Sequence, residues 1–218
     1  MGRVIADISM SLDGYVAGPD PSLDEPLGKG GEQLHEWVFG LRAWREPHGK
    51  PGGETGPIND AVEERVRRTG ATVMGRKMYS GGEGPWEDDP RADGWWGDNP
   101  PFHHPVFVLT HHPREPLAME GGTTFTFVTD GVESALEQAS EAAGDKDVAI
   151  AGGAEAIQQY LASGLVDELQ LHVVPLLLGD GARLLEGLAP DRLELETTSV
   201  IESAGVTHLR YQVGATGR

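Results

Sequence analysis

The chain has 218 residues with 35 acidic and 17 basic side chains, which gives a formal charge of −18 at neutral pH. This length predicts one domain over residues 1–218 with room for a full hydrophobic core. An acidic surface disfavours nucleic acid or an anionic membrane as a partner, because contact with phosphate needs a basic face.

The predicted elements alternate between strand and helix through the first three quarters of the chain. Apolar runs predict strands, and apolar residues at helical spacing predict helices. A strand over 166–179 and a hairpin over 193–213, turning near Ala204, close the chain. This pattern indicates an α/β fold with a mostly parallel central sheet, flanking helices and a C-terminal antiparallel hairpin. The other strands are predicted at 3–9, 71–75, 106–110, 124–129 and 147–153. Helices are predicted at 32–44, at about 58–68, after a capping box of Asp130 and Glu133 to about Ala143, and at 154–163.

A long insertion over about 80–105 interrupts this alternation. Connections of this length inside a compact domain are usually functional. It holds Trp86, Trp95 and Trp96, three of the five tryptophans, and also Phe102. These aromatic side chains can stack on a flat ligand ring, bury a dimer contact or pack against one another.

Three predicted strands end in residues that suit a phosphorylated ligand. In open α/β sheets, ligands bind beyond the carboxyl ends of the strands. Gly75 is followed by Arg76 and Lys77, where an anion site competes with a plain exposed helix start. Gly152 and Gly153 end another strand, and paired glycines there permit close contact with a pyrophosphate or simply make a tight turn.

The third strand end carries Thr110, His111, His112 and Arg114, which can hold a ribose phosphate or form a polar strand exit. Neighbouring side chains on a strand point to opposite faces, so each His-His pair offers one zinc ligand at most. We therefore expect no metal. With no cysteine and no apolar run of roughly 18 residues, the chain is expected to be cytoplasmic, without a membrane span.

Taken together, several segments resemble a known family. They are "IADISMSLDGYVAG", "VMGRKMY", "VFVLT" and "AIAGGAEAIQQYLASGLVDELQLHVVPLLLGDG". The chain resembles the dihydrofolate reductase-like superfamily, in the branch related to the C-terminal reductase domain of riboflavin biosynthesis. The resemblance implies a cytoplasmic, homodimeric oxidoreductase that uses NADPH. It would transfer a hydride to a C=O or C=N of a small heterocyclic substrate, in the manner of 5-amino-6-(5-phosphoribosylamino)uracil reductase or dihydrofolate reductase.

The resemblance also implies which residues hold the cofactor. Arg76 would be the main cation along the phosphates, and a cis peptide bond is expected between Gly152 and Gly153. The full set of implied NADPH-binding residues is Ala6, Val16, Gly18, Gly75, Arg76, Lys77, Met78, Leu109, Thr110, His111, Gly152, Gly153, Ala154 and Ile157.

Candidate catalytic and substrate residues are less well marked. Glu36 on the predicted 32–44 helix and Asp13 in "SLDGY" are the candidate acids, although a solvated helix face and a turn are the competing interpretations. The riboflavin-pathway reductases carry an acid just before Gly-Gly, where this chain has Ala151. The expected substrate pocket comprises Trp37, Trp86, Trp96 and Phe102.

Two other functions compete with a reductase. A protein of the same fold could bind NADPH or a flavin without turnover, as the missing acids suggest. A Rossmann dehydrogenase would need G-x-G-x-x-G after the first strand, and "ADISMSLDGYVAG" lacks it.

Overall fold

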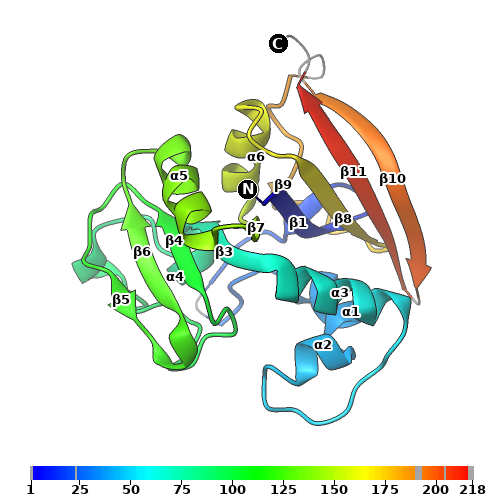
Figure 1. Ribbon diagram of the computed structural model, residues 1–218, viewed down its shortest axis with the longest axis horizontal. Coiled ribbons are helices and arrows are strands. Elements are labelled where there is room, and N and C mark those ends of the chain that lie inside the picture. Colours follow the sequence, from blue (N-terminus) through cyan, green and yellow to red (C-terminus); the bar gives the residue numbers. More distant parts are fainter. Residues whose placement is uncertain (1, 23, 190–192, 204, 216–218) are drawn as a thin grey trace. The chain divides into compact units, whose positions relative to one another are not determined.

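The structure is a computed structural model that describes residues 2–22, 24–189, 193–203 and 205–215. It contains two compact units (Figure 1). The first comprises the chain up to Ala6 together with Thr69–Asp167, and the second comprises Asp7–Arg68 together with the chain from Glu168 onward. None of the helices in the described part of the chain reaches the length and hydrophobicity that a membrane crossing requires.

The first unit is built on a mostly parallel sheet with the strand order β1-β7-β3-β4-β6-β5, to which β1 contributes its first residues. The four neighbouring pairs from β1 to β6 are parallel, and only the short β5 runs antiparallel to its neighbour. This confirms the predicted α/β class and the five strands predicted here. The strands are β1 (Val4–Ser11), β3 (Thr69–Gly75), β4 (Pro105–Leu109), β5 (Leu117–Ala118), β6 (Thr124–Val128) and β7 (Asp147–Gly152).

Helices cover this sheet through small and apolar side chains. Helix α5 (Val132–Ala143) buries Ala135, Ala139 and Ala143, and this flat face packs against β3 and β4. Helix α6 (Ala154–Ala162) follows β7 directly. The remaining helical turns are α4 (Arg76–Ser80), η2 (Trp86–Asp88) and η3 (Glu120–Gly122). The capping box predicted from Asp130 and Glu133 is wrong, because Gly131 is the residue that precedes α5 and the helix has no side-chain cap.

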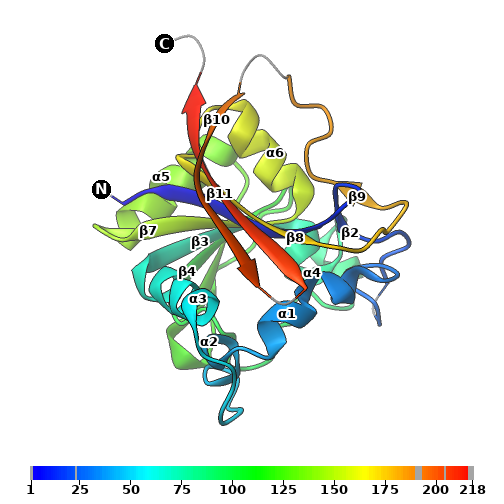
Figure 2. The same ribbon diagram turned by 90° about the vertical axis from the view of Figure 1, so that its right-hand side faces the viewer.

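The second unit holds the remaining part of β1 and the antiparallel strands, in the order β10-β11-β8-β1. The hairpin of β10 (Leu193–Ser203) and β11 (Val206–Ala215) pairs with β8 (Glu168–Val174), as Figure 2 shows. This confirms the predicted C-terminal hairpin, while its predicted turn residue Ala204 lies outside the described residues. Strands β2 (Tyr15–Ala17) and β9 (Ala182–Arg183) form a separate small ladder.

The helix predicted over 32–44 is wrong as a continuous element. The segment forms three short turns, namely η1 (Gly31–His35), α1 (Glu36–Phe39) and α2 (Arg42–Arg45). Leu41 is extended, with φ −72° and ψ 143°, and interrupts the helix between α1 and α2. By contrast, α3 (Pro57–Arg68) forms one helix close to the predicted bounds.

Candidate functional site

The carboxyl ends of β3, β4 and β7 lie side by side in the first unit. Gly75 is paired with Leu109 across the β3–β4 ladder, and Met74 is paired with Gly152 across β3–β7. Three segments far apart in the sequence therefore meet at one edge of the sheet. The predicted residues Arg76, Thr110 and Gly153 follow directly after these strand ends.

The Gly152-Gly153 peptide bond is cis, as the resemblance implied. Gly152 has φ 125°, which favours glycine. A side chain added at Gly153 would meet nothing within 4 Å, so open space lies above this peptide. Gly153 precedes α6 without a side-chain cap, so the first backbone N–H groups of α6 are free to bind an anion. Ala154 and Ile157 are buried on that helix and hold it against the sheet.

The side chain of Arg76 is buried among three other side chains, those of Ser80, Trp86 and Asp89. Its side chain is 6% exposed and that of its ion-pair partner, Asp89 of the insertion, is 3% exposed. The guanidinium Nε–H donates to Ser80 Oγ at 3.1 Å, and the Ser80 hydroxyl donates to Asp89 at 2.7 Å. The planar face lies 3.2 Å from the ring centre of Trp86. Burial lowers the pKa of Arg76, and the Asp89 carboxylate opposes that effect.

A second arginine lies on the same tryptophan ring. Arg114 lies 5.1 Å from the ring centre of Trp86 and pairs with Asp93 of the insertion. The Trp86 indole N–H donates to the carbonyl of His112 at 2.9 Å. The insertion is therefore tied to the ends of both β3 and β4 by charged and aromatic contacts.

The other predicted residues at this edge differ in accessibility. Lys77 is exposed and pairs with Glu83 and Glu155, and His111 is also exposed. Thr110 is buried, and its hydroxyl accepts a hydrogen bond from the backbone N–H of His112 at 3.1 Å. Met78 packs against the core, and Ala6 lies opposite Ile150 in the β1–β7 ladder.

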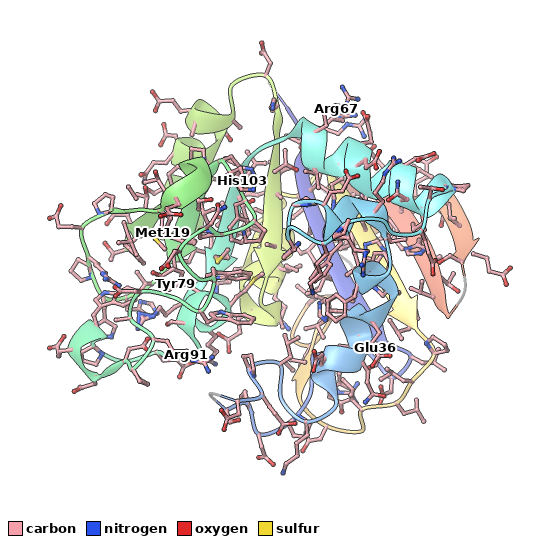
Figure 3. The ribbon with its side chains drawn as sticks, turned by 90° about the horizontal axis from the view of Figure 1, so that it is seen from below. Glu36, Arg67, Tyr79, Arg91, His103 and Met119 are labelled. Atoms are coloured by element: carbon pink, nitrogen blue, oxygen red, sulfur yellow. The ribbon has the colours of Figure 1, made fainter. Side chains whose placement is uncertain are left out.

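The aromatic residues of the insertion pack against the core of the first unit. Trp86, Trp96 and Phe102 lie against a buried cluster around Tyr79, which Figure 3 labels. Trp96 and Phe102 pack edge to face, with their ring centres 4.9 Å apart. These contacts correspond to the self-packing alternative, and a role of the three residues in a substrate pocket stays a prediction.

The candidate acids lie in the second unit, and their catalytic role stays a prediction. Glu36 is exposed on α1 (Figure 3). Asp13 accepts hydrogen bonds from the Ser11 hydroxyl at 2.6 Å and from the backbone N–H groups of Leu178 and Gly179. The hydrogen bond from Ser11 is the main reason that the pKa of Asp13 is lowered, so it stays a carboxylate that ties a turn.

Two further predicted cofactor residues lie near this turn. Val16 is buried in β2, and the backbone of Gly18 lies so close to Lys29 that an added side chain would meet its carbonyl oxygen at 2.0 Å. Whether they cover a nicotinamide stays a prediction.

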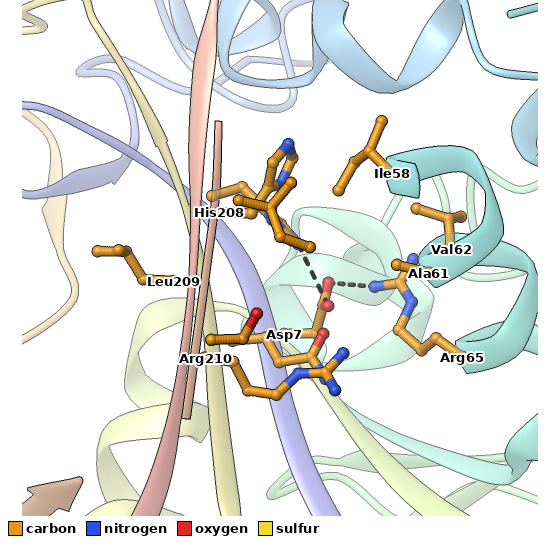
Figure 4. Close-up of a pocket in the computed structure, with 12 residues that line it drawn as sticks. Asp7, Ile58, Ala61, Val62, Arg65, His208, Leu209 and Arg210 are labelled. Carbon is orange, nitrogen blue, oxygen red and sulfur yellow. Dashed lines mark hydrogen bonds and ion pairs between the residues drawn. The ribbon is translucent and has the colours of Figure 1, made fainter. Parts of the chain in front are cut away.

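Sequence reasoning missed a buried polar cluster in the second unit. Asp7 pairs with Arg65 of α3 and lies 3.2 Å from His172 Nε2, and His172 Nδ1 lies 2.7 Å from His208 Nδ1. Figure 4 shows Arg65 reaching toward Asp7 at the side of a small cavity. Polar residues within apolar strands, as in "VIADIS", "LQLHVV" and "VTHLRY", were the available signal.

Among the described residues, no group of three or more His, Asp or Glu side chains has an arrangement that could hold a metal ion. In this cluster the two imidazole nitrogens are 2.7 Å apart. Two nitrogen ligands of one tetrahedral zinc would be about 3.3 Å apart, given Zn–N bonds of ~2.0 Å. The short distance is that of a hydrogen bond.

A family model and several solved structures match nearly the whole chain. The model of the family described as the RibD C-terminal domain matches residues 3–209. A search of curated protein sequences gives no match.

Solved structures share the fold at low sequence identity. A candidate riboflavin biosynthesis protein from Shewanella sp. PV-4 is 23% identical with a TM-score of 0.60, and the alignment covers 97% of this chain and 99% of that one. The riboflavin biosynthesis reductase of Saccharomyces cerevisiae is 14% identical with a TM-score of 0.51, over 98% and 89% of the two chains. Dihydrofolate reductase from Enterococcus faecalis, solved with NADP(H), is 14% identical with a TM-score of 0.53, over 97% and 96%.

Proposed function

The chain belongs to the RibD C-terminal domain family, and from this premise we propose that it is an NADPH-dependent reductase. It transfers a hydride to a C=O or C=N of a small heterocyclic substrate. A nicotinamide cofactor supplies the hydride, so the protein has to bind and orient it, exclude water and provide a proton.

The observation that carries the proposal is the shared edge formed by the ends of β3, β4 and β7. Open space above Gly153 leaves room for a ligand to approach the backbone closely. Arg76 Nη1 is buried and has no hydrogen-bond partner among the described residues, so this guanidinium retains a donor that an anion can satisfy. Both features fit a phosphorylated dinucleotide.

The residues at this edge would bind different parts of the cofactor. Gly75, Gly152 and Gly153 allow the backbone to approach the cofactor, and the start of α6 offers N–H groups to a phosphate. Arg76 and Lys77 supply positive charge, and Thr110 and His111 lie where a ribose phosphate would be held. Ala6 is buried beside β7, and its small side chain leaves room for a ring above it.

Binding of NADPH tests this proposal directly. We expect calorimetry to detect one NADPH per chain, and a Gly153→Ala variant to bind at least about tenfold more weakly, because the new methyl group enters the open space. Gly84→Ala is the matched control, since a side chain at Gly84 also meets nothing within 4 Å but lies in the insertion. Equal affinity in both variants would contradict the placement.

Turnover is tested separately with deuterium-labelled NADPH and a panel of pterins, pyrimidine ribosylamines and quinones. Label transfer to one of them supports a reductase. Tight binding without transfer to any would favour a protein that binds NADPH without turnover, an alternative supported by the engaged Asp13 and the exposed Glu36. A flavin in place of NADPH would be visible in the absorbance spectrum of the purified protein. The homodimer and the cytoplasmic location stay predictions.

A further inference from the structure

The arginine and lysine side chains just beyond the ends of β3 and β4 are each paired with a carboxylate of the insertion. The pairs are Arg76–Asp89, Lys77–Glu83 and Arg114–Asp93. All of these residues belong to the first unit. The cations lie where we place the phosphates of the cofactor, so the insertion brings its own negative charge to that edge of the sheet. We call its residues 83–93 the acidic strap.

The three pairs differ in burial. The side chains of Glu83 and Asp93 are 65% and 80% exposed, so their pairs are screened by solvent and contribute little to stability. Arg76 and Asp89, by contrast, are both buried, and breaking such a pair leaves a charge without compensation. The contact between Arg76 and Asp89 therefore decides whether the strap stays in place.

The carboxylate of Asp89 contacts the groups that would bind a phosphate. Its Oδ2 atom accepts hydrogen bonds from the Arg76 guanidinium and, at 2.7 Å, from the Ser80 hydroxyl. Its Oδ1 atom accepts at 2.9 Å from the backbone N–H of Arg91, a strap residue that Figure 3 labels, and this local contact holds the carboxylate toward Arg76. Gly82 permits the close approach, because a side chain there would collide with Oδ2. Asp89 therefore occupies the position of an anionic ligand.

The carboxylate does not satisfy Arg76 completely. The Nε–H group donates to Ser80 Oγ at 3.1 Å and Nη2 donates to Asp89, but Nη1 is buried and has no partner among the described residues. A buried donor without an acceptor costs free energy. A phosphate group carries at least three acceptor oxygens, one more than a carboxylate. It can therefore satisfy the guanidinium better than Asp89 does.

The strap also closes off Arg76 from solvent. The ring centre of Trp86 lies 3.2 Å from the guanidinium carbon, and Nη1 has almost no exposed surface. Trp86 is itself fixed, because its indole N–H donates to the carbonyl of His112 at 2.9 Å. An anion in solution therefore reaches Arg76 only if the strap moves.

We propose that the acidic strap competes with the phosphates of NADPH for Arg76, an inference that rests on the proposed reductase function. Asp89 holds the guanidinium until a phosphate takes its place, and the strap then moves away together with Trp86. Opening the strap uses part of the binding free energy, so the apparent affinity is lower than that of an open edge. Only a ligand with a phosphate at Arg76 opens it, so the strap selects phosphorylated ligands.

The competition is tested first with inorganic pyrophosphate, which needs no nicotinamide site. We expect calorimetry to show that Asp89→Asn binds pyrophosphate about tenfold or more tightly than the parent protein, because a neutral amide competes less well for a cation. Low temperature keeps this variant folded, which circular dichroism verifies. Asp98→Asn is the control, since Asp98 is an exposed carboxylate of the insertion outside the strap. Unchanged, weaker or undetectable binding by Asp89→Asn would overturn the proposal.

A second variant opens the strap without changing any charge. Gly82→Ala places a methyl group against Asp89 Oδ2, so it should also tighten pyrophosphate binding. Gly84→Ala is its control, since a side chain there meets nothing within 4 Å. In an Arg76→Gln background neither Asp89→Asn nor Gly82→Ala should have an effect, because the cation is gone. An effect that persists without Arg76 would refute competition for this residue.

Movement of the strap is tested by hydrogen exchange in the presence of NADPH. The backbone N–H groups of Asp89 and Ala92 donate within the strap, to the carbonyls of Trp86 and Asp89 at 3.2 and 3.1 Å. We expect these amides to exchange faster when NADPH binds, because the strap leaves the side chains that cover it, whereas the amides of α5 should not change. Slower or unchanged exchange in the strap would show that it stays in place and would contradict displacement.

The two proposals fail in different ways. If NADPH binds neither the parent protein nor the variants, while Asp89→Asn binds pyrophosphate more tightly, the reductase function fails and the competition between Asp89 and phosphate stands. If NADPH binds and every variant binds pyrophosphate like the parent protein, only the role of the strap is rejected.

Discussion

Arg76 carries a positive charge in a nearly dry setting, and its neighbours Asp89 and Trp86 come from the insertion. A buried ion pair costs much of its Coulomb energy in desolvation, but removing one partner leaves the other charge uncompensated. The Arg76–Asp89 pair therefore anchors the insertion more firmly than the exposed pairs around Lys77, which are screened by solvent.

Asp89→Asn should lower the free energy of unfolding by roughly 3–5 kcal/mol, because Arg76 would stay buried without a counter-charge. Urea denaturation measures this change. Asp98→Asn serves as the control, since Asp98 is an exposed carboxylate of the same insertion. A loss that is equally small in both variants would show that the pair does not anchor the insertion.

The sequence predicted where Arg76 lies but not what holds it. A glycine followed by two cations at a strand end marks the position, because strand and turn patterns are local. Asp89 lies thirteen positions further along in an insertion without periodicity, so nothing local connects the two residues. For the same reason, Trp86 could be predicted as an aromatic of the insertion but not as the surface on which Arg76 stacks.

At the scale of elements, the packing of β3 on α5 depends on a glycine at the start of the strand. Gly70 belongs to β3, and a side chain there would meet Ala143 Cα at 2.9 Å and Lys146 Cβ at 2.8 Å. The C-terminal end of α5 therefore approaches the start of the strand as closely as backbone atoms allow.

Gly70→Ala should lower the free energy of unfolding by about 1–3 kcal/mol, because an extra methyl group in a packed contact forces a shift of the backbone. Thermal unfolding followed by circular dichroism measures the effect. Gly84→Ala should stay within about 0.5 kcal/mol of the parent protein, as expected for an open surface position. If the two variants unfold alike, the β3–α5 contact is looser than described.

In the segment 32–44, the spacing of the apolar residues correctly predicted which side chains are buried, but it wrongly predicted one continuous helix. Leu34 and Leu41 are both buried, as their spacing predicted, but they lie in two different hydrophobic clusters. Gly40 follows α1, and the extended Leu41 redirects the chain into α2. The spacing of apolar residues indicates which side chains are buried. It does not indicate whether they belong to one hydrophobic cluster or to two.

At the scale of the whole molecule, buried histidines set the response to acid. Burial lowers the pKa of His104 and of His208 to about 4. In the unfolded chain histidine titrates near ~6.5, so the unfolded state binds more protons between these values. The free energy of unfolding must then fall as the pH drops through this window.

We expect this loss of stability to begin near pH ~6.5 and to level off below about 4, with each histidine contributing on the order of 1–3 kcal/mol. Urea titrations at several pH values measure the slope. His104→Gln should flatten it while keeping a side-chain hydrogen bond to Thr72, the present partner of His104 at 2.8 Å. His48→Gln is the control, and equal slopes in both variants would contradict the assignment.

Asp7 affects the stability of the protein in a lower pH range than the histidines do. Its pKa is held below the ordinary value, so its contribution to the free energy of unfolding is complete above pH ~4 and is lost as the pH falls further.

The class of fold, its main strands and the meeting of three strand ends were predictable from alternation and turn residues alone. The buried polar cluster of the second unit was not, because Asp7, His172 and His208 are far apart in sequence and become neighbours only through strand order.

Trp37 packs against the imidazoles of His172 and His208 and donates its indole N–H to Ser9 at 3.0 Å. A protonated imidazole in contact with an excited indole quenches its fluorescence more strongly than a neutral imidazole does. Because burial lowers the pKa of His208 to about 4, we expect the part of the emission that comes from Trp37 to fall only as the pH approaches this value. The difference in emission between the parent protein and a Trp37→Phe variant isolates this tryptophan from the other four and measures the change.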